Sequence, residues 1–326
     1  MRFFGYLVHA AVLLCATQPV HATFSIAACE ADSGRCGVAV ATHNLSVGHG
    51  VPFAEFEVGA GVSQFETNAC HAPAALASLR QDATAARALE AALFAERECD
   101  DGQDATYRQI GVVSFGGSSA AHTGREAAGF AGSRSQGLVT VQGNGLASEA
   151  VLAAMWDTFH QSSGGLGARL LLALEAGHNA GGQRIGVMSA ALIVATENGW
   201  PVDLDLRVDF APATAVAELR VIFDANYARQ LLFRARRTPS ERQAEALISE
   251  ALQRAPTWDR MWLRAARMAR DAGNTNEAQF RACRFAALNP VWASTLDAEF
   301  DFDECARGPV VSHGVSAAQA ERMWIE

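Results

Sequence analysis

A threonine at position 23 stands directly after the tripeptide Val20-His21-Ala22, in the stretch PVHATFSIAACE. Small residues at the third and first positions before a bond are typical of a signal-peptidase site. A cut after Ala22 would make Thr23 the N-terminal residue, with its hydroxyl and its α-amine close together. An α-amine has an ordinary pKa of about 7.7–8.0, so near neutral pH part of it is neutral and takes up the hydroxyl proton. The stretch therefore predicts a threonine nucleophile that carries its own base.

Residues 1–22 have the layout of a secretory signal peptide. Arg2 supplies a positive charge, an apolar segment runs from Phe3 to Ala16, and a polar tripeptide precedes the small residues. The apolar segment is shorter than the roughly 20 residues of a membrane-spanning helix. Leu14 disfavours both a lipoprotein cut before Cys15 and a cut after Ala16. We expect an exported protein, periplasmic or extracellular, without a membrane span after processing.

The bulk composition indicates a globular protein and disfavours the binding of polyanions. The 326 residues are 50% hydrophobic, which is enough for a buried core. The net charge of -9 arises from 35 acidic and 26 basic residues, and no long basic run occurs. This balance disfavours nucleic acid and anionic membranes as partners.

Removal of Cys15 with the signal would leave an even number of cysteines in an oxidising compartment. In principle about fifteen pairings of six cysteines exist, and buried free thiols are the alternative. The simplest pairing joins each cysteine to the next one along the sequence. Those pairs are Cys29 with Cys36, Cys70 with Cys99, and Cys283 with Cys305.

Clusters of short strands alternate with paired helices from residue 23 to residue 210. We expect strands at 23–29, 36–42, 56–64, 107–115, 118–124, 137–144, 189–196 and 201–210. Helices are expected at 73–97, where Asp82 would cap the second of two, and at 149–161 and 165–182. Because regular βαβ alternation is missing, this order favours an antiparallel α+β layered sandwich over a doubly wound parallel sheet.

Residues 225–326 form a predicted helical region rich in arginine and alanine. Pro256 and Pro290 are 34 positions apart. Between them Trp262, Ala266 and Ala278 stand where a tetratricopeptide repeat has its aromatic and small residues. We expect a C-terminal helical appendage that resembles tetratricopeptide helix pairs. It would cap the main domain or hold a partner protein.

Several blocks resemble those of domain of unknown function 1028 (DUF1028), in the order of that family. They include TFSIAACEADSGRCGVAVATHNLSVGHGVPFAE, GAGVSQFETNACHAPAALASL, QIGVVSFGGSSAAHTG, VQGN, GGQRIGVMSAALIV and DLRVD. The resemblance covers residues 23–224 and implies a four-layer αββα sandwich like that of the N-terminal nucleophile (Ntn) hydrolases, with amide-bond hydrolysis as the activity. Family members commonly begin Met-Thr-Phe-Ser, whereas here an export signal replaces the initiator methionine. The family's substrate is not established.

Two asparagines are candidates for holding the oxyanion of an amide-hydrolysis intermediate. Asn144 in VQGNG ends a strand just before a helix, and Asn68 in ETNAC is in a comparable place. A side-chain amide together with neighbouring backbone N–H groups can form an oxyanion hole there. The alternative for both is an ordinary turn residue.

Other polar residues are candidates for positioning the substrate. His43, at the end of the second strand, would orient the amine or bind substrate, unless its role is structural. His122 in AAHTG and Arg184 in QRIGVMS match blocks of the resemblance, and Arg184 would clamp a carboxylate. Asp205, Arg207 and neighbouring aspartates share one strand face, which we expect to be solvated with internal ion pairing.

Several catalytic motifs are absent from the sequence. There is no H-E-x-x-H and no pair of C-x-x-C motifs, so no metal is predicted. GGLGARLL lacks the full G-x-G-x-x-G and a preceding strand, so no dinucleotide cofactor is predicted. The serine-hydrolase motif G-x-S-x-G is missing as well.

Two functions from different classes follow from these observations. The first is an exported Ntn-type amide-bond hydrolase that uses Thr23 on a peptide or an acylated amine of the cell envelope. The second is a non-catalytic envelope binding protein, in which the sandwich is a scaffold and the C-terminal helices hold a protein partner. In that case Thr23 is only a strand residue, since threonine is common in strands. A homo-oligomer is compatible with either function.

Overall fold

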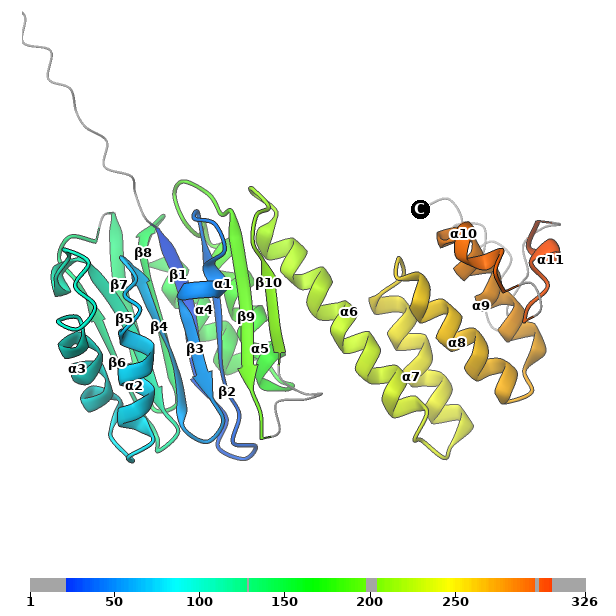
Figure 1. Ribbon diagram of the computed structural model, residues 1–326, viewed down its shortest axis with the longest axis horizontal. Coiled ribbons are helices and arrows are strands. Elements are labelled where there is room, and N and C mark those ends of the chain that lie inside the picture. Colours follow the sequence, from blue (N-terminus) through cyan, green and yellow to red (C-terminus); the bar gives the residue numbers. More distant parts are fainter. Residues whose placement is uncertain (1–21, 128, 198–203, 297–298, 307–326) are drawn as a thin grey trace, which may run out of the picture. The chain divides into compact units, whose positions relative to one another are not determined.

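The computed structural model describes residues 22–127, 129–197, 204–296 and 299–306 (Figure 1). The chain divides into two compact units between Val216 and Ala217. Strands and helices make up the described part of the first unit, and helices make up that of the second. The first unit holds two antiparallel sheets. The α+β class predicted from the sequence is confirmed.

The larger sheet has the strand order β10-β9-β2-β1-β8-β7. Its strands are β1 (Thr23–Cys29), β2 (Cys36–Thr42), β7 (Phe130–Gln136), β8 (Val139–Leu146), β9 (Ser189–Ala195) and β10 (Leu204–Val208). All seven residues of β1 are buried, because this central strand pairs with β2 and β8 and is covered on both faces. Position 23 is therefore fixed inside the sheet.

The smaller sheet has the order β3-β4-β5-β6 and lies against the larger one. Its strands are β3 (Pro52–Glu55), β4 (Gly59–Phe65), β5 (Arg108–Ser114) and β6 (Ser118–Thr123). Ala27, Val38 and Val62 belong to an apolar core between the two sheets. The odd-numbered residues of β1 therefore face the smaller sheet, and the even-numbered ones face the other way.

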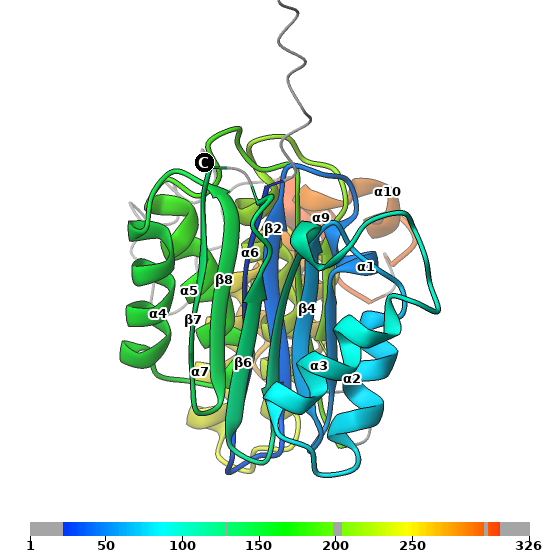
Figure 2. The same cartoon turned by 90° about the vertical axis from the view of Figure 1, so that its left-hand side faces the viewer.

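Paired helices cover the outer face of each sheet, as Figure 2 shows. The helices α2 (His71–Leu79) and α3 (Ala85–Ala95) lie on the smaller sheet, and α4 (Ala150–Gln161) and α5 (Leu166–Asn179) lie on the larger one. Two short elements, α1 (Val47–Gly50) and the 3-10 helix η1 (Ala105–Tyr107), lie in connections.

The structure differs from the sequence predictions in three local features. Thr84, not Asp82, caps α3, because its side chain accepts the N–H of Arg87, while Asp82 occupies a left-handed turn position with φ 58°. The strands β3 and β7 were not predicted. β7 is an edge strand whose polar, mostly half-buried or exposed residues lack a continuous apolar face. Asp203 of the expected acidic strand face lies outside the described residues, whereas Arg207 pairs with Asp205 at 2.6 Å, as expected.

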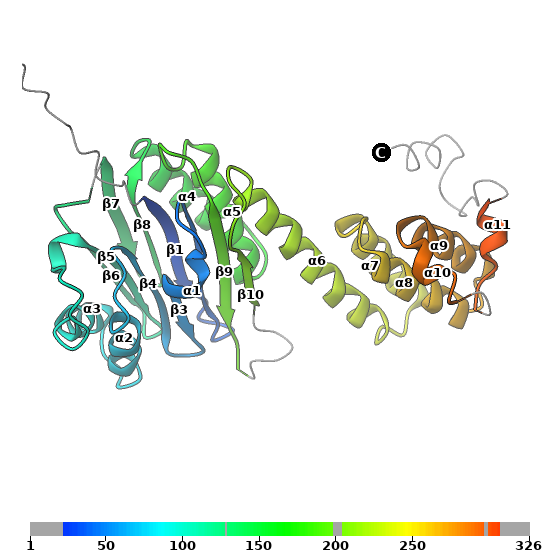
Figure 3. The same ribbon diagram turned by 45° about the horizontal axis from the view of Figure 1, so that its top comes forward.

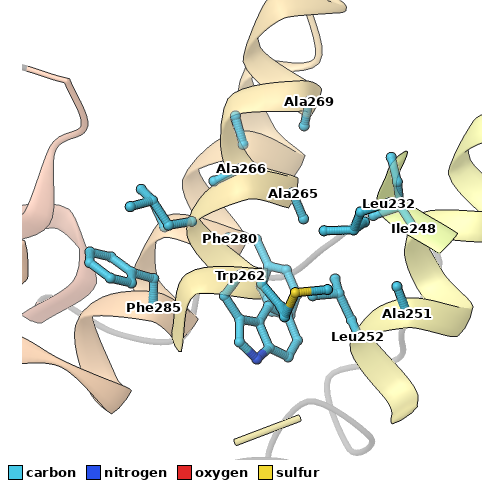
Figure 4. Packing of buried hydrophobic residues seen from close by; sticks show 14 of the residues in the cluster. Leu232, Ile248, Ala251, Leu252, Trp262, Ala265, Ala266, Ala269, Phe280 and Phe285 are labelled. Atoms are coloured by element: carbon cyan, nitrogen blue, oxygen red, sulfur yellow. The ribbon is translucent and has the colours of Figure 1, made fainter. Parts of the chain in front are cut away.

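The second unit is built from successive helices, which Figure 3 shows next to one another. They are α6 (Ala215–Ala235), whose first residues precede the boundary, α7 (Glu241–Arg254), α8 (Asp259–Asp271), α9 (Thr275–Leu288), α10 (Pro290–Ala293) and α11 (Phe302–Ala306). Leu232, Ile248 and Trp262 come from three of these helices and meet in one buried core (Figure 4). The Trp262 indole also donates to the Pro256 carbonyl at 2.8 Å, so its polar atom is satisfied within the core.

Three disulfides close short segments of the chain. They are Cys29–Cys36 across the β1–β2 hairpin, Cys70–Cys99 around the α2–α3 pair, and Cys283–Cys305 in the second unit. The pairing of sequence neighbours predicted from the sequence is confirmed. Within the described residues, no helix is long and apolar enough to cross a membrane.

The ion pairs of Glu299 give the second unit a pH-dependent stability. Arg267 and Arg270 both bind this carboxylate, and their hydrogen bonds lower its pKa from 4.5 to about 2. A lowered pKa means that the pairs stabilise the fold above pH 4.5 and that this contribution disappears as the pH falls towards 2. We expect about 1–2 kcal/mol of such stabilisation, since the groups are partly solvated. Urea unfolding of the helical unit at pH 6 and pH 3 measures it. Glu299→Gln should lose less stability between these pH values than the unchanged protein, and an equal loss would contradict the assignment.

Candidate functional site

Thr23 begins β1 and lies between two neighbouring strands. In the register of the sheet it is opposite Thr42 of β2 and opposite Asn144 of β8. Only 3% of Thr23 is exposed, and Asn144 is fully buried. The Thr23 N–H donates to Asn144 Oδ1 at 3.2 Å, so the structure brings together the two residues that the sequence proposed as nucleophile and oxyanion holder.

The hydroxyl of Thr42 fixes the direction of the hydrogen bond from Thr23. Thr42 Oγ1 donates its only proton to the carbonyl oxygen of Ala22 at 2.7 Å. The 3.0 Å contact between the two threonine hydroxyls must then use the proton of Thr23. In this structure, where Ala22 precedes Thr23, the Thr23 hydroxyl therefore donates a hydrogen bond to Thr42 Oγ1. The Ala22 carbonyl oxygen accepts the hydrogen bond from Thr42 Oγ1.

Buried glutamines link this position to the smaller sheet. Gln109 of β5 accepts from Asn144 Nδ2 at 2.8 Å and from Gln64 Nε2 at 2.7 Å. Its own amide donates to the carbonyl of Gly143 at 2.9 Å. Gln64 also reaches β1, because its Oε1 accepts the Ser25 hydroxyl at 2.7 Å. We call Thr23, Ser25, Gln64, Gln109 and Asn144 the inter-sheet polar network.

The inter-sheet polar network lies where an apolar core would be expected. Each of its members is at least 97% buried. Desolvated amides and hydroxyls are costly unless they are hydrogen-bonded, and removal of one partner exposes the others to that cost. The network therefore holds the Asn144 side chain in one orientation beside Thr23.

A pocket of about 260 Å³ opens next to Thr23. Its lining carries hydroxyl, amide and apolar side chains, with one imidazole and neither an acidic residue nor an arginine. The lining residues are Thr23, Thr42, Asn44, Leu45, Ser46, Val47, His49, Gly50, Val51, Phe65 and Thr67.

Two residues of this pocket have unusual backbone conformations. Ser46 has φ 52° and Phe65 has φ 70°, in the left-handed region that disfavours residues with a side chain. Such a conformation costs of order 1–3 kcal/mol and tends to occur at functional sites. Both residues line the same pocket as Thr23.

Asn68, the other oxyanion candidate, belongs to a different cluster. Its amide donates to the carbonyl of Cys99 at 2.7 Å and to Asp101 at 3.1 Å, and its Oδ1 accepts the N–H of Cys70. The same cluster holds Arg108, 1% of whose side chain is exposed, in an ion pair with Asp101 at 2.5 Å. Asn68 therefore holds the loop after α3, and no hydrogen bond joins it to Thr23 or Asn144 among the described residues.

A buried histidine completes this second cluster. His71 Nδ1 lies 2.7 Å from the hydroxyl of Ser63, and its Nε2 lies 3.0 Å from Glu96, which also binds Arg108. Burial, together with the positive charge of Arg108, lowers the pKa of His71, although the hydrogen bond and the charge of Glu96 act in the opposite direction. The imidazole is therefore neutral at neutral pH and serves as a structural hydrogen-bonding group.

Within the part of the chain that the structure describes, His43, His122 and Arg184 make no hydrogen bond to Thr23 and do not line its pocket. His122 of β6 donates to the carbonyl of Ala105 at 2.7 Å, while its neighbour Thr123 accepts from Gln109 of the inter-sheet polar network. His43 directly follows Thr42, and its Nδ1 is buried without a partner among the described residues. Arg184 has an exposed side chain, and its backbone N–H donates to the carbonyl of Gly145, next to Asn144.

Sequence reasoning missed Thr42, Gln64 and Gln109. The sequence holds an indirect signal for them. In VTVQGN, Thr140, Gln142 and Asn144 alternate with Val139, Val141 and Gly143 and so place polar groups on one buried strand face, which requires polar partners from other strands. Within the described part of the chain, no group of three His, Cys, Asp or Glu residues gathers in a way that could hold a metal ion.

Comparisons with known proteins agree with the fold of the first unit. A family model described as a family of unknown function, DUF1028, matches residues 23–219. The crystal structure of a protein from Silicibacter pomeroyi, assigned to the same family model, is similar with a TM-score of 0.55 and 30% sequence identity, over 62% of this chain and 84% of that chain. No curated protein matches.

Replacement of Gln109 tests whether the inter-sheet polar network is a structural unit. Gln109→Leu leaves the amides of Asn144 and Gln64 buried without their acceptor, so we expect a loss of about 2–4 kcal/mol in the free energy of unfolding. Urea denaturation of the first unit measures it. Gln161→Leu, at the exposed end of α4, is the matched control and should change stability by less than about 0.5 kcal/mol. Equal effects of the two changes would refute the network's role.

Proposed function

The chain belongs to the DUF1028 family, and we propose that it is an exported Ntn-type hydrolase of amide bonds, with Thr23 as the nucleophile once the signal peptide has been removed after Ala22. One observation carries the proposal. The nitrogen and the hydroxyl of Thr23 are both held by buried polar partners, Asn144 and Thr42, beside a pocket. The helix pairs on the outer faces of the two sheets support an Ntn-like αββα sandwich.

Cleavage at Ala22 would turn the Thr23 nitrogen from a peptide N–H into an α-amine at the same position. A peptide nitrogen is no base, whereas an α-amine with an ordinary pKa of about 7.7–8.0 is one. Asn144 Oδ1 accepts a hydrogen bond from this nitrogen at 3.2 Å, which would aim the lone pair of the neutral amine away from Asn144. The nucleophile and the base, both from Thr23 of β1, would then lie beside Asn144 of β8, which orients the base.

The proposed reaction proceeds in two steps. Thr23 Oγ1 attacks the substrate carbonyl carbon while its proton passes to the α-amine, and the resulting oxyanion collapses as the C–N bond breaks and the leaving amine takes that proton. Water then attacks the Thr23 ester, the α-amine accepts the water proton, and the acid product leaves with Thr23 Oγ1 reprotonated. Asn144 Nδ2 donates one N–H to Gln109 Oε1, and its second N–H would donate to the oxyanion.

The lining of the pocket favours an uncharged acyl group. Leu45, Val51 and Phe65 provide apolar surface, and Asn44 and Thr67 provide polar groups, without a carboxylate or a guanidinium. An amide whose acyl part is neutral fits this lining best, such as a peptide or an acylated amine of the cell envelope. The exposed Arg184, near Asn144, would contact a more distant part of the substrate. His43 keeps a positioning role in the proposal, because its buried Nδ1 has no partner among the described residues.

Location and the helical unit complete the proposal. Three disulfides are compatible with an oxidising compartment outside the cytoplasm. The helices of the second unit would pack as tetratricopeptide-like pairs, because Trp262, Ala266 and Ala278 are buried and Pro290 begins a helix, as in that repeat.

The first test concerns the Ala22–Thr23 bond and the hydroxyl. We expect the intact mass of the exported protein to correspond to a chain that starts at Thr23. Thr23→Ala should abolish turnover of short neutral acyl amides, while Thr23→Ser, cut at the same bond, should retain part of it because a hydroxyl remains. A mature chain that starts elsewhere would remove the base, and undiminished turnover by Thr23→Ala would show that another group is the nucleophile. Absence of turnover by the unchanged, correctly cut protein would favour the non-catalytic binding function.

The second test separates the two asparagines. Loss of one oxyanion donor costs about 10²–10³ in kcat, so Asn144→Ala should lower kcat by this factor. Asn68→Ala should instead lower the free energy of unfolding by about 1–3 kcal/mol, because Asp101 and the Cys99 carbonyl lose a buried donor. Steady-state kinetics and urea denaturation of both variants decide the matter. A larger kcat loss in Asn68→Ala would reverse the assignment.

A further inference from the structure

A groove with guanidinium groups runs between α6 and α8 of the second unit. It has a volume of about 310 Å³. Its walls are made by Arg229, Leu232, Phe233, Arg236, Arg264, Arg267, Met268 and Asp271. A second pocket of about 630 Å³ adjoins it and shares Arg236, Met268 and Asp271. Together the two pockets form an elongated surface, which we call the α6–α8 groove.

The positive charges of the α6–α8 groove are only partly neutralised. Arg267 binds Glu299 at 2.7 Å, and Asp271 is paired with Arg270 at 3.3 Å. Arg236 and Arg264, by contrast, have no ion pair with an acidic residue in the described ranges. Two guanidinium groups are therefore available in the groove to a ligand.

The surroundings of Arg264 favour the binding of an anion to its guanidinium group. Its guanidinium carbon lies 6.0 Å from the centre of the Phe233 ring. Burial lowers the pKa of Arg264, and neighbouring positive charges lower it further. Those charges are Arg260, Arg229 and Arg236. An approaching carboxylate would relieve this repulsion and form charge-assisted hydrogen bonds.

The groove also has an apolar component. Leu232 and Met268 line it, and 47% of Phe233 is exposed there, which is unusual for a large aromatic side chain. Figure 4 shows Leu232 and Ile248 next to each other in the buried core of the helical unit. A ligand with both carboxylates and apolar side chains matches such a surface better than a small inorganic anion does.

The charge of the helical unit differs from that of the whole chain. The chain has a net charge of -9, whereas residues 217–326 hold 15 arginines and 15 aspartates and glutamates, so this unit has a net charge near zero. The acidic excess of the chain therefore lies outside this unit, and the unit as a whole does not repel an acidic ligand.

We propose that the α6–α8 groove binds an acidic peptide segment, with Arg236 and Arg264 on its carboxylates and Phe233 against its apolar side chains. The adjoining pocket gives room beyond Arg236 for a peptide that continues past its acidic residues, since it is lined by Glu241 and Glu245 as well as Arg242. Binding does not depend on amide hydrolysis at Thr23, so this inference and the proposed function stand or fall separately.

Fluorescence polarisation of a labelled short peptide in which glutamate alternates with leucine tests the proposal on the purified full chain. Arg236→Gln and Arg264→Gln should each weaken binding about five-fold to ten-fold, the loss of one charge-assisted contact. Arg264→Lys should weaken it less, because the charge remains. The control is Arg234→Gln, which removes the same charge from the exposed side of α6 outside the groove and should change binding less than about two-fold.

Four outcomes would overturn the proposal. They are the absence of measurable binding, an equal loss in Arg234→Gln, equal binding of a peptide with glutamine in place of glutamate, and displacement of the peptide by about 1 mM inorganic phosphate. The last result would identify a site for small anions. Circular dichroism of each variant shows whether the helical unit remains folded, and the exposed positions of Arg234 and Arg236 make both changes compatible with folding.

Discussion

The pairing of β1 on both of its edges is the constraint on which the first unit depends. Because β2 and β8 both pair with this strand, the register places Thr42 and Asn144 opposite Thr23. Side chains directly opposite in a sheet share one face, and here that face points to the second sheet. A polar residue at position 23 therefore creates a need for polar partners in a region without water, and Gln64 and Gln109 meet that need.

The polar face also explains a glycine in the facing strand. A Cβ added to Gly111 of β5 would lie 2.2 Å from Oε1 of Gln142, which is closer than any real contact. Gln142 in turn donates to the Ser25 hydroxyl at 2.7 Å. The two sheets can approach at this level only because β5 has no side chain there, so close packing and the hydrogen bonds of the network depend on each other.

Local features could be predicted from the sequence, and long-range contacts could not. The β1–β2 hairpin and the Cys29–Cys36 pair follow from the alternation of the strands and from a sequence separation of seven positions. Gln109 and Asn144, by contrast, are 35 positions apart and meet only because two sheets stack. Asn68 and Asn144 looked equivalent in sequence because both precede a helix. Their difference comes from Arg108, a buried charge on the outer face of the smaller sheet that draws the Asn68 loop to itself through Asp101.

In the proposed mechanism, the uncut chain is inactive for two independent reasons. The first is that the Thr23 nitrogen is part of a peptide bond and cannot accept a proton. The second is that the Ala22 carbonyl accepts the hydrogen bond of the Thr42 hydroxyl at 2.7 Å. Ala22 is itself fully buried, so it occupies space beside the nucleophile. Removal of the signal would create the base, release the Thr42 hydroxyl and vacate that space in one event. In this proposal, the start of β1 at Thr23 lets a cut after Ala22 bring a terminal amine, a hydroxyl and the buried amide of Asn144 together at one sheet position.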